Sequence, residues 1–452
     1  MFGLPSLHAT LGAEQCPRHE NCSCGSFLNV GRWVVTKMSL APLTTPNHGA
    51  MFLAPRIRQA RASPTAEISN AVRLLRSAGR TVINLGEGEL DFDTPDHVRS
   101  AGIEAIRSGH TKYTPVSGTH ELRQAIVHKF QSENGLHFEV TEVIAGTGAK
   151  QIIFSAFQAT VSRGDEVILP APYWVSYPDM VRLADGAPVE VGCNENASWK
   201  LRPEQLAAAI TPRTRWVVLN SPSNPTGAIY SRQELAALAD VLVDHPHVLI
   251  LSDDIYEHIR YDGDFATIAA VEPRLKERTL TVNGVSKAYS MTGWRLGYAG
   301  GPAWLISAID MLHSQSTSNP SSISQAATIC ALRHGTQFLA EWIAELKVRR
   351  DLAAKILNTA NGLRTGLPEG AFYLFVNCNA TLGKKAPNGT IIDNDLHFAN
   401  YLLDSVGVGT VHGSAFGAPG YIRIAYAIDR DSLENACNKI VEACAALANR
   451  SA

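Results

Sequence analysis

From about Pro95 to residue 330, short apolar runs rich in β-branched residues alternate with longer amphipathic stretches. This alternation constrains the fold more than any other feature of the chain. The predicted strands are 166–170, 215–220, 247–254, 279–284 and 296–301. Several are apolar on both faces, as in parallel strands that are covered on both sides. The stretch 232–245 instead repeats apolar residues at intervals of three and four, which is typical of a helix. The alternation therefore predicts an α/β doubly wound core, with a mostly parallel central sheet sandwiched by helices.

The pattern changes after about residue 330. A long helical run over 338–360 is followed by short strands at 371–377 and 421–427, and a helical run over 431–448 closes the chain. This order predicts a second, smaller α+β domain. We expect four parts in all: an N-terminal extension (1–50), a segment joining the small domain (51–94), a large domain (95–330) and a small C-terminal domain (331–452).

The first 50 residues are rich in Pro, Gly, Asn and Ser and lack sustained periodicity. This composition predicts a poorly ordered extension. Met38 and Met51 are alternative translation starts, so we hypothesise that the extension is not translated. Mass spectrometry of the native N-terminus tests this hypothesis.

The composition excludes several kinds of partner. The chain has 452 residues, 45% of them hydrophobic and 18% charged, with a formal net charge of −2. This balance gives no electrostatic reason to expect nucleic acid or anionic membrane as a partner. No run of about 18 apolar residues is present, so no membrane span is expected. These features predict a cytoplasmic globular protein.

The eight cysteines are scattered along the chain rather than arranged as a disulfide framework. Three of them, Cys16, Cys22 and Cys24, flank His19 near the N-terminus. Their C-x5-C-x-C spacing is not a usual zinc pattern, and a fourth ligand is not obvious. We therefore predict reduced cysteines and no metal site.

The motif VNGVSKAYSMTGWRLGYAGG, residues 282–301, points to chemistry. Lys287 directly follows a predicted buried strand. Burial lowers the pKa of a lysine and frees an amine that can form a Schiff base with an aldehyde. Eight residues later, Arg295 could bind a phosphate through its planar guanidinium. A surface lysine beside a structural arginine is the alternative, and a lone Ser-Lys pair would favour it.

Two further motifs place polar side chains at strand ends, where open α/β sheets bind ligands. In LSDDIYEH (251–258), Asp253 ends an apolar strand, and a carboxylate there can hold a pyridine nitrogen protonated, which makes the ring an electron sink. Tyr256 follows three residues later and could reach a ring hydroxyl. NSPSNPTG (220–227) offers Asn224 in a loop flanked by prolines.

A glycine-rich turn opens a predicted helix in GTGAKQIIFSAF (146–157), where free backbone N–H groups and the helix dipole suit a phosphate. APYWVSY (171–177) supplies Trp174, whose flat ring could stack on a cofactor. Such turns are common, and a tryptophan near a strand end is more often part of a core. Each motif alone is therefore weak, whereas the order and spacing of all five together are specific.

With these motifs the chain resembles the class I/II aminotransferases of pyridoxal-5′-phosphate (PLP) fold type I, over roughly residues 51–450. Within the family it is most similar to the bacterial aspartate aminotransferase branch that includes aspartate/prephenate enzymes. The motifs that carry the resemblance are GEGELDFDTP (86–95), KYTPVSGTHELR (112–123), PYWVSYP (172–178), NSPSNPTG, SDDIYEH and SKAYSMTGWRLGY. The resemblance implies PLP as cofactor and ping-pong transfer of an amino group from an L-amino acid to a 2-oxo acid.

The resemblance also implies a role for each matching residue around the cofactor. Lys287 would be the Schiff-base lysine and would shuttle a proton between Cα and C4′. Asp253 would pair with the pyridinium nitrogen, Asn224 and Tyr256 would hydrogen-bond the ring hydroxyl, and Trp174 would stack on the ring. The phosphate would be held by Gly148, Ala149, Lys150 and Arg295.

For the substrate, the resemblance implies that Arg423 binds the α-carboxylate, and that the backbone of Gly88 closes over the same group. Trp174 and Asn224 would contact the substrate as well. Tyr113 would reach the phosphate of the neighbouring subunit's cofactor, which implies a homodimer. An arginine that alternates with apolar residues on a strand can also simply face solvent, which is the alternative for Arg423.

Departures from the branch bear on the choice of substrate. Leu90 stands where the branch usually has Pro, and Thr119-His120 where it has Ile-Pro. In RASPTAEIS (61–69), Arg61 could contact a distal carboxylate, but Glu67 replaces a small or apolar residue and could weaken that contact. We predict aspartate or glutamate as donor and an acceptor such as 2-oxoglutarate. Transamination of aromatic or broad-range amino acids is the first alternative.

Other functions are compatible with part of the pattern. A PLP-dependent β-eliminating lyase would use the same core residues, so the motifs leave it open. A PLP-sensing transcription regulator would need a basic helix-turn-helix domain, which residues 1–50 do not contain. A cofactor-free interaction protein would have lost some polar site residues, and none is missing.

Overall fold

The structure, a computed structural model, describes residues 52–449, so the predicted extension over 1–50 and its Cys/His group lie outside the described residues. A seven-stranded sheet forms the centre of the larger lobe, in the order β2-β8-β7-β6-β5-β3-β4. Its strands are β2 (Val143–Gly146), β3 (Glu166–Ala171), β4 (Ala187–Gly192), β5 (Thr214–Asn220), β6 (Leu249–Asp253), β7 (Thr279–Gly284) and β8 (Gly297–Gly300). β7, β6, β5, β3 and β4 run parallel, and β8 is antiparallel to both of its neighbours. The predicted mostly parallel α/β sheet is confirmed.

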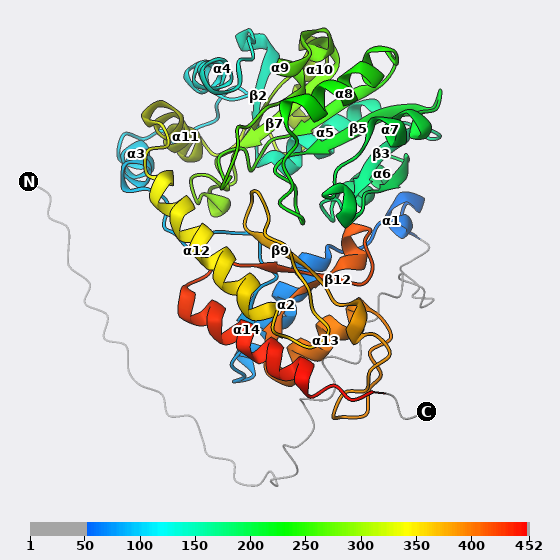
Figure 1. Cartoon of the computed structure of the whole chain (residues 1–452). Helices are drawn as coiled ribbons and strands as arrows, with labels where there is room; N and C mark the ends of the chain where they lie inside the picture. Colours follow the sequence, from blue (N-terminus) through cyan, green and yellow to red (C-terminus); the bar gives the residue numbers. More distant parts are fainter. Residues whose placement is uncertain (1–51, 450–452) are drawn as a thin grey trace, which may run out of the picture. The chain divides into compact units, whose positions relative to one another are not determined.

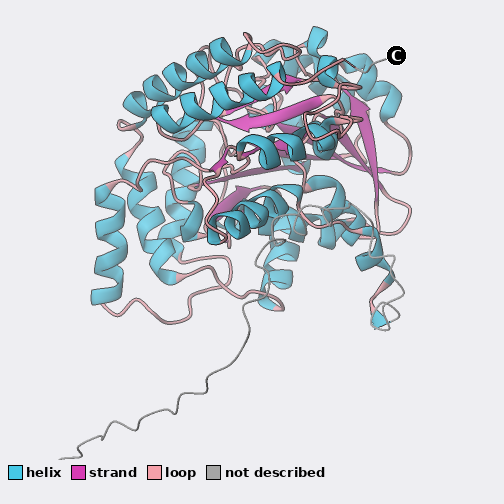
Figure 2. Ribbon diagram, turned by 90° about the horizontal axis from the view of Figure 1, so that it is seen from below, coloured by secondary structure: helices cyan, strands magenta, loops and turns pink. Residues whose placement is uncertain are grey.

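The central strands are apolar throughout because both faces of the sheet are covered. Val167, Leu169 and Val218 pack with residues of α5 (Ala149–Thr160), α6 (Tyr177–Leu183) and α10 (Ala303–Ser314). Ile168 and Val217, their neighbours in the sequence, pack with residues of α7 (Pro203–Ala209), α8 (Arg232–Val243) and α9 (Ile268–Val271). Successive side chains of a strand point to opposite faces, so an apolar run buries both. Figure 2 shows these strands lying among the helices.

The remaining helices of the larger lobe pack at the β2 and β8 side of the sheet. They are α3 (Asp96–Arg107), α4 (His120–Asn134) and α11 (Ser322–His334). α4 begins at Thr119, whose hydroxyl accepts a hydrogen bond from Leu122 N, and it ends at Gly135, which has a left-handed φ of 67°. The Thr119-His120 departure noted in the sequence therefore supplies an ordinary helix cap.

The smaller lobe is built on a three-stranded antiparallel sheet of β9 (Tyr373–Asn377), β12 (Tyr421–Ala425) and β11 (Val411–His412). It packs with α12 (Leu339–Leu357), α13 (Asp395–Val406) and α14 (Arg430–Ala445) in one apolar core. Figure 1 shows these elements together below the large sheet. The strands and helices predicted for this part of the chain are present.

An N-terminal segment joins the smaller lobe. Of its two helices, α2 (Pro64–Ser77) packs against the strands of the smaller lobe, whereas α1 (Pro55–Gln59) packs against α6 of the larger lobe. β1 (Ile83–Asn84) pairs in parallel with β10 (Val408–Gly409). The residue boundaries of the predicted domains stay a prediction.

Two strands of the large sheet, β2 and β4, have no counterpart in the sequence prediction. β2 has only four residues. β4 lies at the end of the strand order, contains Pro188 and is only partly buried, so it lacks the continuous apolar run of the central strands. β2 and β4 are the two edge strands of the sheet, and edge strands give weaker signals than central ones, so the sequence pattern predicted neither.

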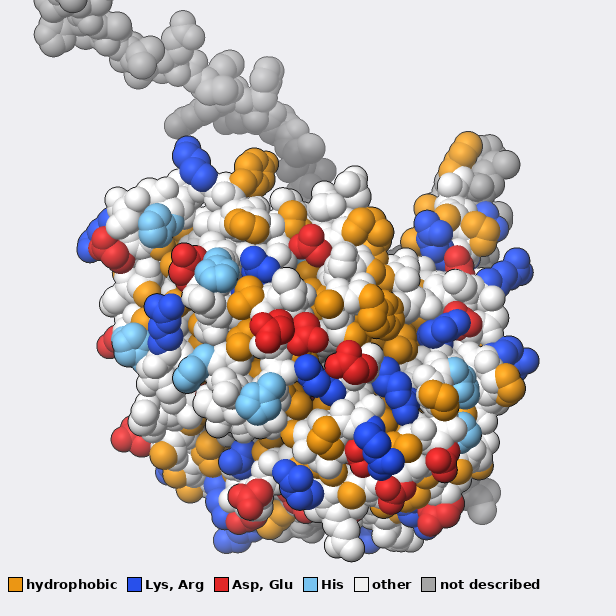
Figure 3. All heavy atoms as spheres, turned by 90° about the horizontal axis from the view of Figure 1, so that it is seen from above, with side chains coloured by type: hydrophobic (Ala, Val, Ile, Leu, Met, Phe, Trp, Pro, Cys, Tyr) orange, Lys and Arg blue, Asp and Glu red, His pale blue; other side chains and the backbone are white. Residues whose placement is uncertain are grey.

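The described surface fits the composition. On the face drawn in Figure 3, basic and acidic side chains are interspersed, with no extended area of one sign. Among the described helices, none combines the length and the apolar character needed to cross a bilayer. The five described cysteines are free thiols: Cys193, Cys330, Cys378, Cys437 and Cys444. All of them except Cys330 are buried.

A buried ion pair fixes the loop that follows β6 against α4. Lys129 donates a hydrogen bond to Glu257, and both side chains are almost fully buried. Asn134 Nδ2 lies 2.5 Å from the other carboxylate oxygen, and Lys129 Nζ lies 2.7 Å from Asn134 Oδ1. Burial alone would raise the pKa of Glu257, but the charges of Lys129 and His258 outweigh it and lower that pKa. Glu257 adjoins Tyr256, so this pair anchors a predicted site residue.

We expect Lys129→Met to destabilise the protein by about 3–5 kcal/mol, because it leaves the Glu257 carboxylate buried without its cation. The double variant Lys129→Met/Glu257→Met removes both charges and is expected to recover most of that loss. Thermal unfolding midpoints of the three proteins measure the difference. A single variant as stable as the double variant would contradict the assignment.

Candidate active site

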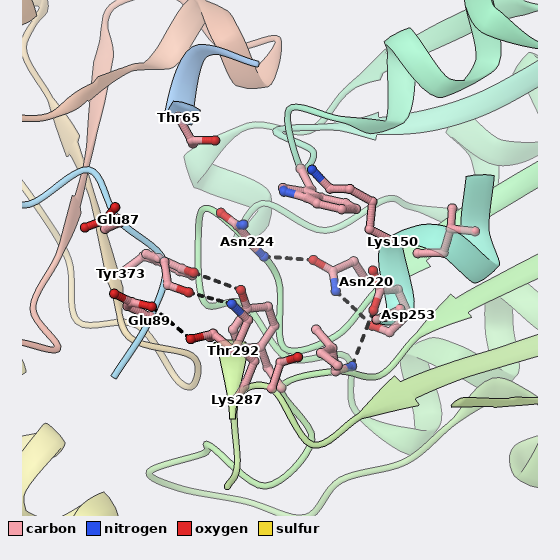
Figure 4. A pocket seen from close by; sticks show the side chains of 18 of the residues that line it. Thr65, Glu87, Glu89, Lys150, Asn220, Asn224, Asp253, Lys287, Thr292 and Tyr373 are labelled. Atoms are coloured by element: carbon pink, nitrogen blue, oxygen red, sulfur yellow. Dashed lines mark hydrogen bonds between the residues drawn. The ribbon is translucent and has the colours of Figure 1, made fainter. Parts of the chain in front are cut away.

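A cavity of about 320 Å³ lies where the carboxyl ends of β5, β6 and β7 face the smaller lobe. Figure 4 shows side chains from both lobes pointing into it. Its lining includes nearly all of the predicted site residues: Gly88, Gly148, Ala149, Lys150, Trp174, Asn224, Asp253, Tyr256, Lys287, Arg295 and Arg423. Tyr113 is the exception. Open α/β sheets bind ligands at the carboxyl ends of their strands, so the position of the cavity is the one expected for this fold.

Lys287 lies just after β7 and is half-buried in the lining of the cavity. Its Nζ donates a hydrogen bond to the backbone oxygen of Gly88. Burial, followed by the positive charge of Arg423, lowers the pKa of Lys287 to about 8. The ammonium group is less favoured here than in water, so a larger fraction of Lys287 is the neutral, nucleophilic amine near neutral pH than for an ordinary lysine.

Asp253 is the last residue of β6 and is buried. One of its carboxylate oxygens accepts a hydrogen bond of 2.5 Å from the hydroxyl of Tyr177. Burial raises the pKa of Asp253 to about 6, against the lowering effect of Tyr177 and of the nearby Lys287. A cationic hydrogen-bond donor in the cavity would offset the burial penalty and favour the ionised carboxylate.

Asn220 links Asp253 to the loop that carries Asn224. It ends β5 beside Asp253, and its Nδ2 donates to the backbone oxygen of Asp253 at 2.8 Å. Its Oδ1 accepts from the backbone N–H of Asn224, also at 2.8 Å. Two adjacent parallel strands and one amide side chain therefore set the positions of Asp253 and Asn224.

Arg423 on β12 reaches the cavity from the smaller lobe and is only 1% exposed, so the solvent-face alternative is wrong. Its guanidinium donates to Asn224 Oδ1 at 2.9 Å and to the backbone oxygen of Gly86 at 2.6 Å. It also stacks on the ring of Tyr373, 4.4 Å from the ring centroid. Among the described residues no carboxylate pairs with it, and its Nε has no hydrogen-bond partner. Burial lowers its pKa, so a bound anion would compensate a desolvated cation.

A second cationic corner lies at the N-terminus of α5. Gly148 precedes the helix with φ 91°, and a Cβ at this position would come within 2.6 Å of Arg295 Nη2. Glycine is therefore favoured by the backbone conformation, and it leaves room for the Arg295 guanidinium. Desolvation, and then the charge of Arg295, lower the pKa of Lys150, although part of its side chain stays exposed. Two cations that face helix N–H groups form an anion site.

Aromatic residues line the remaining walls. Trp174, just after β3, packs edge-on against Tyr177 with 5.2 Å between ring centroids, and Lys150 Nζ lies 4.9 Å from its ring. The hydroxyls of Tyr256 and Tyr373 lie 2.8 Å apart. Burial raises the pKa of Tyr256 well above its ordinary value, so its hydroxyl stays protonated and can donate.

Several functional positions were missed in the sequence. Tyr373 lies in a segment predicted only as a strand, and Tyr177 belongs to a motif of which only Trp174 was selected. Thr65 lines the cavity, although the prediction for its segment named Arg61 and Glu67. A tyrosine at a strand terminus is a usable signal, whereas nothing in the pattern around Thr65 marks it.

Three residues are not brought into the cavity. Tyr113 is 91% exposed. Arg61 lines a neighbouring cavity of about 420 Å³, which shares Lys150 and Arg295 with the first. Glu67 is half-buried on α2 and lines neither cavity.

The arrangement joins a nucleophilic lysine, a buried carboxylate and two anion sites around one cavity. The family of aminotransferases of class I and II has a sequence model that matches residues 80–440. The chain belongs to this family. The predicted fold class, PLP fold type I, and the prediction of an aminotransferase are thereby confirmed.

Individual relatives of this aminotransferase agree with the family assignment. The aspartate/prephenate aminotransferase of Cereibacter sphaeroides is 52% identical over 397 residues, which cover 88% of this chain and 99% of the relative. The crystal structure of the aspartate aminotransferase from Rhizobium meliloti matches with a TM-score of 0.84 and 51% identity, over 88% and 99% of the two chains. That of an aromatic aminotransferase from Pyrococcus horikoshii matches with a TM-score of 0.74 and 37% identity, over 82% and 98%.

The raised pKa of Asp253 predicts a pH-dependent effect of Asp253→Asn on the stability of the cofactor-free aminotransferase. The folded-state pKa of about 6 lies above the ordinary value of 3.8, so the wild type loses stability as the pH rises through about 6. The asparagine variant does not. We expect the stability of the variant relative to wild type to rise by about 1–2 kcal/mol between pH 5 and pH 8.

Thermal unfolding midpoints at several pH values measure this difference. The pH-independent effect of the substitution cancels, because only the change with pH is compared. A relative stability that is flat or falls over this range would contradict the burial penalty at Asp253.

Proposed function

We propose that the chain is a PLP-dependent aminotransferase that takes aspartate or glutamate as amino donor and a 2-oxo acid such as 2-oxoglutarate as acceptor. The observation that carries the proposal is the meeting of Lys287, Asp253 and Arg423 in one cavity of about 320 Å³, with Asp253 and Arg423 buried and Lys287 half-buried. The names of the relatives support the donor: the two most similar ones above are named for aspartate or for aspartate and prephenate.

The residues present fit PLP. Asp253 offers a buried carboxylate to a pyridinium nitrogen, and Tyr256 offers a protonated hydroxyl to a ring oxygen. Trp174 offers an aromatic face, and Lys287 an amine of lowered pKa. The phosphate would lie in the corner formed by Gly148, Ala149, Lys150 and Arg295, where a Cβ at Gly148 would fill the space. When bound through its aldehyde, PLP supplies an electron sink for the pair of electrons left when a substrate C–H bond breaks.

The protein supplies binding, orientation and proton transfer. Arg423 would hold the α-carboxylate of the donor, with Asn224 fixing the guanidinium and Gly88 lying over the same space. Once its amine is free, Lys287 Nζ would take the proton from the substrate Cα, since its lowered pKa keeps a fraction of the amine neutral near neutral pH. Donor and acceptor would use the same site in turn, which predicts ping-pong kinetics.

A dicarboxylate needs a further cation for its distal carboxylate. Arg61 does not line the cavity, whereas Lys150 does. Within the described range, no carboxylate forms an ion pair with Lys150. We propose that Lys150 contributes to dicarboxylate preference from the edge of the phosphate corner. A broad-range or aromatic preference is the second candidate, favoured by the Pyrococcus horikoshii neighbour and by the Trp174 wall.

The first test is spectroscopic. We expect the purified protein with PLP to show a visible absorbance band that aspartate bleaches and 2-oxoglutarate restores. Phenylalanine, alanine and cysteine serve as alternative donors. Bleaching only by another amino acid would support the assignment as a transaminase and change the assigned amino donor. Pyruvate formed from cysteine would favour the lyase alternative. Absence of the band, or a band unchanged in Lys287→Ala, would refute the cofactor assignment.

We further propose a homodimer in which Tyr113 reaches the phosphate corner of the other subunit. Its almost complete exposure in the single chain leaves the side chain free for such a contact. The shared cations Lys150 and Arg295 also line the second, more open cavity, so the corner can be approached from outside the subunit.

Mixed dimers test this arrangement. Tyr113→Ala is expected to lower activity at least tenfold, and Lys287→Ala to abolish it. Refolding the two variants together should raise activity above that of either variant alone, because one site of each hybrid dimer then has both Lys287 and Tyr113 from the other subunit. No recovery on mixing would contradict a contribution across the interface.

A further inference from the structure

Tyr373 is buried at the start of β9, and its hydroxyl joins the two lobes. Its Oη lies 2.8 Å from the hydroxyl of Tyr256, which follows β6 of the large sheet. Within the described range its hydroxyl has no other hydrogen-bond partner. The Tyr256–Tyr373 bond is therefore a contact between the lobes at the wall of the cavity, and Figure 4 shows Tyr373 beside Lys287.

Three neighbours hold Tyr373 in one place. The guanidinium of Arg423 lies 4.4 Å from its ring centroid, and the ring of Phe372 lies at 4.6 Å. On the opposite side, a Cβ at Gly88 would come within 2.6 Å of the Tyr373 hydroxyl. Only glycine leaves room there, so the backbone at Gly88 confines the hydroxyl to its position against Tyr256.

The number of protons decides what this contact can do. One bond between two hydroxyls uses one of their two protons and leaves the other proton for a further acceptor. If Tyr373 donates to Tyr256, the proton of Tyr256 is free to point into the cavity. If Tyr256 donated to Tyr373, the hydroxyl of Tyr256 would offer the cavity only lone pairs.

We propose that Tyr373 is a positioning residue that donates its hydroxyl proton to Tyr256 and so directs the proton of Tyr256 towards the ring oxygen of the cofactor. This inference rests on the proposed function, which assigns that ring oxygen to Tyr256. Hydrogen bonds in a chain polarise one another, so the Tyr373 hydroxyl also makes Tyr256 a stronger donor.

The charged groups around the pair agree with this direction. Arg423, from β12, faces both tyrosines, and Asp253, from β6, faces Tyr256. Lys287 Nζ lies 5.8 Å from the Tyr256 ring centroid. Arg423 acts to lower the pKa of both hydroxyls, whereas the carboxylate of Asp253 acts to raise the pKa of Tyr256 alone. Tyr373 is therefore the more acidic hydroxyl of the two and the better donor.

The test uses Tyr373→Phe, which keeps the ring and its stacking on Arg423 and removes only the hydroxyl. The readout is the pH midpoint of the visible absorbance change of the PLP-loaded protein. A hydrogen bond to the ring oxygen stabilises its deprotonated form, so weakening that bond raises the midpoint. We expect a rise of about one pH unit in Tyr256→Phe and of about half a unit in Tyr373→Phe.

Tyr426→Phe is the matched control. Tyr426 is also fully buried, and its hydroxyl lies 2.8 Å from the hydroxyl of Tyr261, but neither of these two residues lines the cavity. The control loses the same kind of bond, and its midpoint is expected to equal that of wild type. Thermal unfolding of the cofactor-free proteins verifies that each variant folds.

The double variant Tyr256→Phe/Tyr373→Phe tests whether Tyr373 affects the midpoint through Tyr256. If Tyr373 acts through Tyr256, removing the second hydroxyl adds no further rise once the first is gone. An additive rise, an unchanged midpoint in Tyr373→Phe, or an equal rise in Tyr426→Phe would each overturn the proposal. These outcomes are distinct from failure of the proposed function, which would appear in the wild type as a missing band or a missing amino transfer.

Discussion

The desolvation of three ionisable groups without full compensation is the constraint on which the rest of the structure depends. Asp253 and Arg423 are buried and Lys287 is half-buried, and desolvation shifts the pKa of each in the direction that favours its neutral form. A folded chain tolerates such groups only when rigid elements hold them and hydrogen bonds satisfy part of their capacity. A ligand that brings a pyridinium, an aldehyde and carboxylates would complete what the protein leaves open. The groups that a ligand would use are thus the same groups whose desolvation destabilises the folded, ligand-free protein.

The fold meets this constraint by assigning each group to a different rigid element. Asp253 ends a central parallel strand, Lys287 follows the next strand, and Arg423 lies on the antiparallel sheet of the smaller lobe. Neutral polar links then connect them: Asn220 joins two strand ends, and Asn224 joins the large lobe to Arg423. Hydrogen bonds of this kind fix geometry without adding a charge that would cancel the pKa shifts.

How far the sequence reveals this arrangement depends on the kind of signal. The central strands were predicted because burial on both faces leaves continuous apolar runs, and Asp253 and Lys287 because they directly follow such runs. β4 was missed because an edge strand need not be apolar, and β2 because it is a short strand at the opposite edge of the sheet. Tyr177, Tyr373 and Thr65 lie in the site through tertiary packing alone. Their partners are 76 and 117 residues away for the two tyrosines, a distance that no local pattern spans.

The structure also shows which departures from the aspartate aminotransferase branch concern the fold and which concern the substrate site. Leu90, which stands in place of a proline, is buried in the apolar core of the smaller lobe. Thr119, which stands in place of an isoleucine, caps α4. Both departures therefore concern local packing or helix capping. Glu67 is half-buried with a pKa raised by burial, and it does not line the cavity. None of the three therefore argues against a dicarboxylate substrate. Thr65 and Lys150 do line the cavity, and a distal carboxylate would need a cation and a donor of this kind within reach.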